Sequence, residues 1–229
     1  MQELYSNASS ATVGQQYAVS KILRNTYTLL SMTLAFSAIT CAASMALNLG
    51  YGAAMIMNIA AIALIWFVLP RTANSAKGIY VVFAFTGLLG ASLGPTINHY
   101  LAMSNGGQIV MQALGGTAIT FLGLSGYVLT TRKDFSFMRG FLVTGLIVVI
   151  VAALALMVAG MFGVNIAGMH LALSGAIVLL MSGFILYDTS RIINGGETNY
   201  VMATVALYLD IYNLFVSLLH ITGAMSGDD

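Results

Sequence analysis

Seven long apolar segments occupy almost the whole chain and restrict its fold more than any other feature. They lie at residues 26–48, 53–70, 79–101, 108–130, 140–162, 167–190 and 200–223. A helix needs about 20 mainly apolar residues to cross the hydrocarbon core of a bilayer. Only 7% of the residues are charged, whereas soluble domains have roughly 25%. The sequence therefore predicts an all-α membrane protein, a single bundle of seven transmembrane helices.

Short polar ends flank this predicted transmembrane domain, which covers residues 21–225. Residues 1–20 lack the basic start and adjoining apolar core of a signal peptide. We expect them to form a flexible N-terminal tail, and residues 226–229 to form a short C-terminal tail.

The basic residues predict the orientation of the chain in the membrane. With seven spans, all eight fall on one side: Lys21, Arg24, Arg71, Lys77, Arg132, Lys133, Arg139 and Arg191. Because basic loops remain in the cytoplasm, the N-terminus is predicted to be cytoplasmic and the C-terminus periplasmic. A count of six spans would place the C-terminus inside as well.

Several classes of function are disfavoured by what the sequence lacks. The net charge of +1 does not suggest a nucleic-acid partner, and Cys41 is the single cysteine. We find no phosphate-binding loop, zinc motif or serine–histidine arrangement. His99 and His170 fall near the outer edge of the membrane, and no histidine pair has metal-ligand spacing. We therefore expect no enzyme activity, no cofactor and no tight metal site.

Glycines and prolines predict details of the helices. Small residues let membrane helices approach closely, so we expect packing at Gly87, Gly90 and Gly94 and at Gly115, Gly116, Gly123 and Gly126. Pro95 predicts a kink in the third span, and Pro70 an end to the second.

Two acids lie inside the last two spans, Asp188 in the sixth and Asp210 in the seventh. Gly195-Gly196 predicts a turn between the spans, and each acid is 11 residues from the midpoint at residue 199. At 1.5 Å per residue, this is about 16 Å along each helix. If the sixth span stays helical past Arg191, the two carboxyl groups face each other at one depth.

The seventh span also has a polar stripe. Its members follow steps of three or four residues and are Ala203, Ala206, Asp210, Asn213, Ser217 and His220. A polar stripe on an apolar span is expected to face the bundle interior or a water-filled path, so the seventh span is the candidate central helix.

A charge at mid-bilayer costs about 2.5–3.5 kcal/mol on insertion scales, and two adjacent carboxylates also repel each other. We therefore expect Asp188 and Asp210 to share a proton and to titrate as a unit. Release of that proton would recruit a basic side chain, with Arg71 and Arg191 as candidates, or attract a cation such as calcium weakly. The alternative is a purely structural pair that holds the hairpin together.

Several motifs resemble the Bax inhibitor family and its bacterial YccA branch. ILYDTSRI (185–192) and LYLDIYNLFVSLL (207–219) are similar to the last two spans of that family. TTRKDFSF (130–137), GGETNY (195–200), RNTYTLLSMTLAFSAIT (24–40) and FAFTGLLGASLGP (83–95) extend the resemblance to residues 21–225. It implies a seven-helix bundle around a central last helix.

The resemblance implies two functions. Members that leak calcium use two aspartates of the last spans as a pH-sensing pair, with an arginine of the second span as partner; Asp188, Asp210 and Arg71 stand at these places. The YccA branch associates with the FtsH protease and its HflK–HflC partners and modulates the protease, with its N-terminal tail as a degradation handle.

A third hypothesis is an intramembrane aspartyl protease, because its two carboxylates would share a proton and activate water. Such enzymes carry Gly-x-Gly-Asp at the second acid. Here Leu207-Tyr208-Leu209 precedes Asp210, which argues against that chemistry.

Overall fold

The computed structural model describes the backbone of residues 2–164 and 166–226, and within that range the side chains from residue 17 onward. Every regular element in these residues is helical. In chain order they are α1 (Gln2–Ala46), α2 (Tyr51–Ala63), the π-helix η1 (Leu64–Val68), α3 (Leu69–Thr72), α4 (Lys77–Ser92), α5 (Gly94–Leu101), α6 (Gly106–Thr131), the 3₁₀-helix η2 (Ser136–Met138), α7 (Arg139–Met161), α8 (Ala167–Ile193) and α9 (Tyr200–Ser226).

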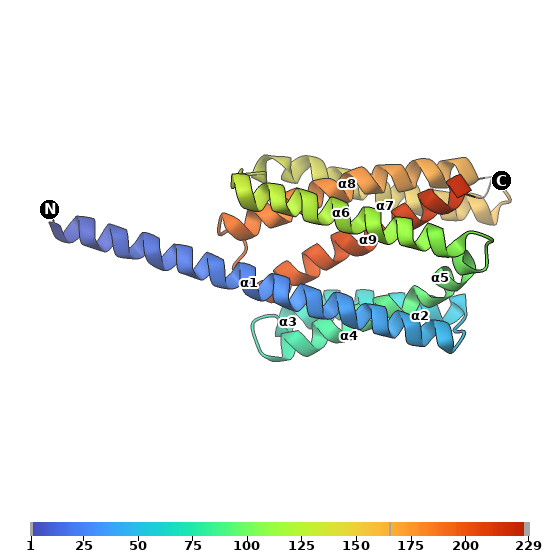
Figure 1. Ribbon diagram of the computed structural model, residues 1–229, viewed down its shortest axis with the longest axis horizontal. Coiled ribbons are helices and arrows are strands. Elements are labelled where there is room, and N and C mark those ends of the chain that lie inside the picture. Colours follow the sequence, from blue (N-terminus) through green and yellow to red (C-terminus); the bar gives the residue numbers. More distant parts are fainter. Residues whose placement is uncertain (1, 165, 227–229) are drawn as a thin grey trace.

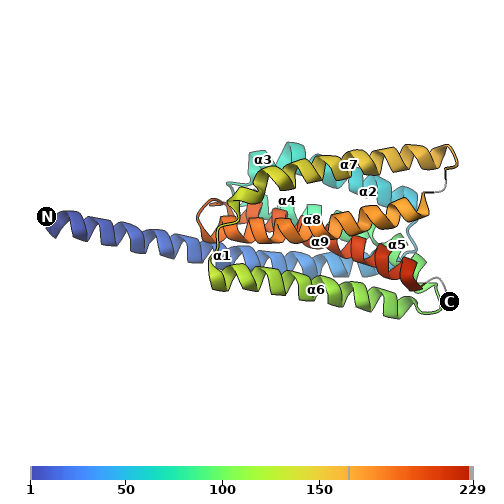
Figure 2. The same ribbon diagram turned by 90° about the horizontal axis from the view of Figure 1, so that it is seen from above.

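These elements form seven units that are long and apolar enough to cross a membrane, which confirms the predicted number. The units are Tyr17–Ala46, Tyr51–Thr72, Lys77–Leu101, Gly106–Thr131, Ser136–Met161, Ala167–Ile193 and Tyr200–Ser226. They lie roughly along the long axis of the molecule (Figures 1 and 2).

The N-terminal segment predicted as a flexible tail has a helical backbone from Gln2 onward. Adding residues to an existing helix costs far less than nucleating a new one, so the polar segment continues the first spanning helix. Figure 1 shows this part of α1 projecting beyond the bundle. The predicted C-terminal tail, residues 226–229, lies outside the described residues except for Ser226, where α9 ends.

The two prolines have different effects. Pro95 falls in the first turn of α5, and the third span is interrupted between α4 and α5 at Leu93, which confirms the predicted kink. Pro70 does not end the second span, because α3 continues to Thr72. The π-helix that precedes it, Leu64–Val68, widens the turn where proline would clash with the backbone.

Glycines of the third span bring α4 and α5 against α1. A Cβ on Gly90 would overlap the carbonyl oxygen of Ser37, and one on Gly94 would overlap the side chain of Ser44. The predicted role of the α6 glycines is wrong at three positions, because Gly115, Gly123 and Gly126 have open space beside them.

Helix α9 lies in contact with α1, α4, α6 and α8. Figure 1 shows it crossing between α6 and α8 on one side and α1 and α4 on the other. In an apolar stretch of 18 residues of α9, 61% of the residues are buried, against 6% in the corresponding stretch of the span that contains α7. α9 therefore places its side chains, including Asp210, deep in the bundle.

Candidate functional site

The turn between α8 and α9 is a C-terminal helix cap built on glycine. Gly195 adopts a positive φ of 74°, which glycine tolerates without strain. Its N–H donates to the Ile192 carbonyl, and the Gly196 N–H donates to the Arg191 carbonyl over 2.8 Å. This pair of bonds is a Schellman motif. The motif ends α8 at Ile193, so the helix continues past Arg191. The prediction that the two acids face each other required this continuation.

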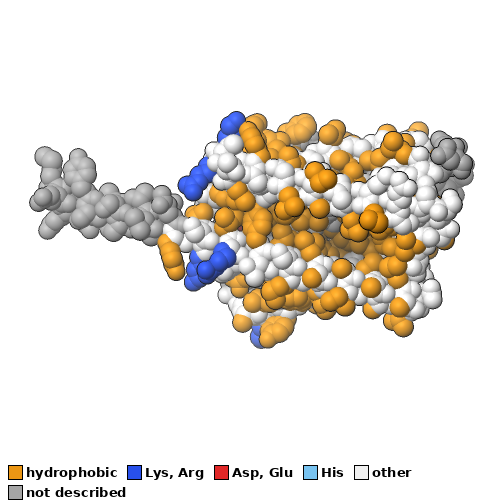
Figure 3. All heavy atoms as spheres, viewed as in Figure 1, with side chains coloured by type: hydrophobic (Ala, Val, Ile, Leu, Met, Phe, Trp, Pro, Cys, Tyr) orange, Lys and Arg blue, Asp and Glu red, His pale blue; other side chains and the backbone are white. Residues whose placement is uncertain are grey.

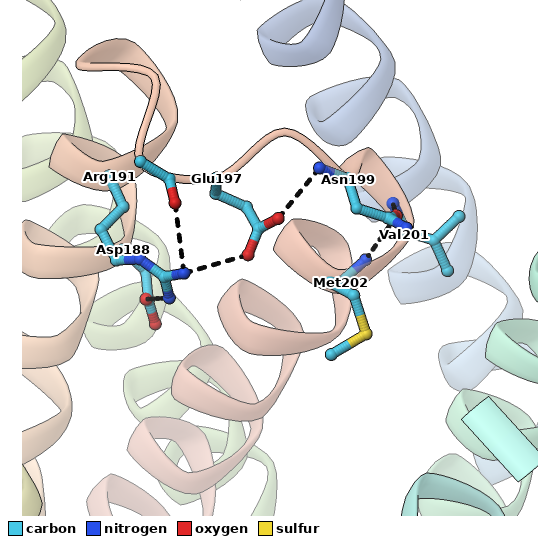
Figure 4. Close-up of polar contacts among 7 residues, drawn as sticks. Asp188, Arg191, Glu197, Asn199, Val201 and Met202 are labelled. Carbon is cyan, nitrogen blue, oxygen red and sulfur yellow. Dashed lines mark hydrogen bonds and ion pairs between the residues drawn. The ribbon is translucent and has the colours of Figure 1, made fainter. Parts of the chain in front are cut away.

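Asn199 begins α9 from the other side of the turn. Its Oδ1 accepts hydrogen bonds from the backbone N–H groups of Val201 (2.8 Å) and Met202 (3.2 Å), as an N-cap residue does (Figure 4). Its Nδ2 donates to the carbonyl of Ala73 and to Oδ1 of Asn74. One side chain thus sets the start of α9 and ties it to the α3–α4 loop.

The hairpin brings the two predicted acids together. Asp188 is 8% exposed and Asp210 is 5% exposed. Their carboxyl groups lie within reach of a side-chain hydrogen bond. Oδ2 of Asp210 is buried and has no hydrogen-bond partner among the residues that the structure describes. A bond between the two carboxyl groups requires a proton on one of them, because two ionised carboxylates have only acceptors.

Arg191 connects this pair to the turn. Its Nη1 lies 3.6 Å from Oδ1 of Asp188, and its Nη2 lies 3.1 Å from Oε2 of Glu197 (Figure 4). Oε1 of Glu197 in turn accepts the Asn199 N–H over 2.9 Å. A charged chain therefore runs from the buried Asp188 to the N-cap of α9.

Arg71, the other candidate counter-ion, points elsewhere. Its Nη1 donates to the carbonyl of Phe67, one turn earlier on its own helix. Both ion pairs in the described part of the chain involve Arg191. Of the two predicted arginines, the structure therefore places Arg191 beside the acids. Arg191 is the one nearer to Asp188 in sequence.

The polar stripe of α9 is buried along part of its length. Asp210 and Ser217 are buried, but the amide of Asn213 donates to the Leu209 carbonyl of its own helix. His220 is exposed, and its ring centroid lies 6.4 Å from that of Tyr100. The predicted stripe therefore contributes a buried acid and packing contacts.

The residues around Asp210 bear on whether it could serve an aspartyl protease or a metal site. Leu207 and Leu209 stand where aspartyl proteases carry the two glycines. Leu207 is 0% exposed and Leu209 is partly buried, so leucine side chains fill the space that a substrate backbone would need. No group of three or more histidine, cysteine or acidic side chains is arranged as a metal site within the described residues.

Two members of this site were not predicted from the sequence. Glu197 follows Arg191 by six residues across the Gly195-Gly196 turn, and this spacing together with the turn signal was the available clue. The contact of Asn199 with Ala73 joins segments 126 residues apart, and no local pattern predicts it.

Comparison with known proteins gives a match over nearly the whole chain. Residues 19–227 match the model of the family described as inhibitor of apoptosis-promoting Bax1. The match contains both aspartates, Arg191 and the turn between α8 and α9.

Individual relatives cover the same length. The chain is 51% identical over 208 residues to the modulator of FtsH protease YccA of Escherichia coli K12, which covers 91% of this chain and 92% of that protein. The same values hold for the inner membrane protein YccA of Escherichia coli O6:H1. A membrane protein of Vibrio cholerae is 53% identical over 209 residues, 91% of this chain and 92% of its own.

Proposed function

This chain belongs to the Bax1-inhibitor family, and from that membership we propose that it is a regulatory protein that associates with the FtsH protease and modulates its action. It is a multi-pass protein of the inner membrane, as its seven spans and its YccA relatives indicate. One observation carries the proposal: 51% identity across 92% of a protein named for modulation of FtsH.

The projecting end of α1 supports a contact with a cytoplasmic protease domain. It leaves the bundle at the end where lysine and arginine side chains gather on the face shown in Figure 3. By the positive-inside rule, that end faces the cytoplasm and the C-terminus faces the periplasm. Residues 1–20 would then be available to FtsH as a handle, while α9 forms the centre of the membrane-embedded bundle.

The test is co-purification from membranes with full-length tagged protein and with a variant that lacks residues 1–20. We expect FtsH to co-purify with the full-length chain, and HflK–HflC to accompany it. The shortened variant is expected to persist longer in cells, while thermal unfolding of its transmembrane bundle stays unchanged. An unrelated multi-pass inner-membrane protein with the same tag is the control. Absence of FtsH from the purified material, with unaltered turnover of its other substrates, would contradict the proposal.

A second function, a pH-sensitive calcium leak, is favoured by the aspartate pair. In the observed arrangement, Asp188 has Arg191 as a positive partner, while Asp210 has a buried carboxyl oxygen without one. A proton on Asp210 would satisfy the pair and keep α8 and α9 together. Its loss would leave a second buried negative charge beside the first, which favours separation of the helices or entry of a cation.

The leak is tested with purified protein in liposomes. Calcium flux is measured against pH for the wild type and for Asp210→Asn, a neutral side chain of the same shape. Asp134→Asn is the matched control, because Asp134 is an exposed loop carboxylate that accepts from the Ser136 N–H. Flux no greater than in protein-free liposomes at every pH would remove this function.

A further inference from the structure

A cavity of about 600 Å³ lies between α1 and α6, on the side of α9 turned away from α8. Its walls run from Ser31 to Met45 on α1 and from Val110 to Leu122 on α6, and its floor is formed by Tyr208, Ile211, Tyr212 and Phe215 of α9. Figure 3 shows a hollowed apolar band along this face, between the two wall helices. We refer to this cavity as the α1–α6 groove.

Both ends of the groove are closed by protein. At the end that carries the basic residues, the Tyr27 hydroxyl of α1 hydrogen-bonds to the Ser125 hydroxyl of α6. At the other end, Leu93 and Ile97 belong to the lining, and α5 packs against α6. The groove spans about 21 Å along α1 at 1.5 Å per residue. It therefore opens sideways, into the hydrocarbon of the bilayer rather than into water.

The lining has few free polar groups that could hold a water molecule. Its hydroxyl groups already have protein partners: Ser31 with Tyr27, Thr117 with Ala113, Ser37 with Tyr208, and Tyr212 with Ser92. A buried water needs two to four polar partners, and the remaining lining side chains are almost all apolar. An empty groove would forfeit dispersion contacts along both walls, so hydrocarbon is the favoured content.

The size of the groove decides what kind of hydrocarbon. A helix with its side chains is about 10–12 Å across, and a stretch about 20 Å long would occupy roughly 1,500 Å³ or more, well beyond the available space. A methylene chain about 4 Å across and 20 Å long needs roughly 250 Å³. One or two acyl chains fit wholly within the groove, whereas a transmembrane helix of a partner would enter it only in part.

We propose that the α1–α6 groove is a lipid-binding site that takes the acyl chains of a membrane phospholipid. The chains pack along α1 and α6 and rest on the aromatic floor of α9. Tyr208 and Tyr212 flank Asp210 in sequence by two residues each, so the lipid contacts the opposite face of the helix that carries the buried acid. This site does not depend on the proposed function.

The single tryptophan makes a direct test feasible. Trp66 on η1 is 73% exposed and serves as the lipid-facing reference. In a Trp66→Phe background, Phe215→Trp places a reporter on the groove floor. Phe85→Trp places one behind α9, where Phe85 is 2% exposed and its ring centroid lies 5.8 Å from that of Tyr208. The full-length variants are reconstituted in phosphatidylethanolamine–phosphatidylglycerol vesicles with plain or brominated acyl chains.

Bromine should quench the floor reporter nearly as strongly as Trp66 and leave the Phe85→Trp reporter almost unquenched. Phe121→Trp on the α6 wall is a second groove reporter should Phe215→Trp fail to fold. Ala118→Phe, which fills the groove from α6, should reduce the quenching of the floor reporter. Ile119→Phe is the matched control, because Ile119 is the next residue of the same helix, is 76% exposed and lies outside the groove lining.

Three results would overturn the lipid site. The first is a groove reporter whose fluorescence bromine quenches as weakly as that of the Phe85→Trp reporter. The second is quenching that Ala118→Phe leaves unchanged, because the bromine would then arrive by another route. The third is quenching that appears only when the protein is diluted in lipid, which would identify a second copy of the chain as the occupant.

Discussion

Arg191 lies 3.6 Å from the Asp188 carboxylate, one helical turn earlier on α8. The same guanidinium reaches Glu197 beyond the Gly195-Gly196 turn at 3.1 Å. Arg191 therefore links the buried acid of α8 to the residue that positions the N-cap of α9. Arg71, the arginine of the second span that the family resemblance implied as the partner, donates to its own helix instead.

We predict that the two arginines differ in their effect on the aspartate pair. Arg191→Gln removes the positive partner of Asp188 and should change the pH dependence of calcium flux in liposomes. Arg71→Gln should leave that dependence as in the wild type, because Arg71 contacts the Phe67 carbonyl. Equal effects of the two substitutions would show that Arg71 moves to the acids in the conducting state.

Asp210→Asn is expected to remove the pH dependence of the flux. The amide matches the carboxyl group in shape and carries no charge, so no second negative charge can appear beside Asp188 as the pH rises. FtsH co-purification with the same variant should be unaffected if protease modulation does not use the pair. A wild-type pH profile for Asp210→Asn would assign the two acids a structural role only.

Asn199→Ala should lower the free energy of unfolding by about 1 kcal/mol, the usual cost of losing an N-cap. Asn199→Ser keeps an oxygen for the Val201 and Met202 N–H groups but loses the amide that bonds to Ala73 and Asn74. Unfolding in detergent should rank wild type above Asn199→Ser and Asn199→Ser above Asn199→Ala. Identical losses would mean that the contact with the α3–α4 loop, rather than the cap, holds the start of α9.

Gly90→Ala should destabilise the bundle by about 1–3 kcal/mol, the range for overpacking. The added Cβ would overlap the Ser37 carbonyl oxygen, which belongs to the backbone of α1 and has little freedom to move. Gly123→Ala is the control, since nothing lies within 4 Å of its Cβ position. Thermal unfolding in one detergent compares the two, and equal melting temperatures would argue against close packing of α1 and α4.

The predicted orientation can be measured with single cysteines. In a Cys41→Ser background, Ser75→Cys lies in the loop before α4 and Ser104→Cys in the loop before α6, both exposed. A membrane-impermeant maleimide added to cells with a permeabilised outer membrane should label Ser104→Cys and spare Ser75→Cys until the inner membrane is opened. The reverse pattern would invert the topology.

Much of the architecture could be predicted from the sequence because it depends on local composition. Whether a segment of about 20 residues crosses a bilayer depends mainly on the polarity of those residues. The seven spans and the kink at Pro95 could be predicted for this reason. The approach of Asp188 to Asp210 could also be predicted, because the glycine turn lies midway between them and α8 stays helical past Arg191.

Other features depend on which helices meet, and no local pattern carries that information. The predicted end of the second span was wrong because a π-helix accommodates Pro70. The choice of Arg191 over Arg71 depended on where each guanidinium points after packing. The α1–α6 groove also depends on contacts between distant segments: Tyr27 and Ser125, which close one end of it, are 98 residues apart. Composition thus determines that the helices enter the membrane, and the packing of their side chains determines what they enclose.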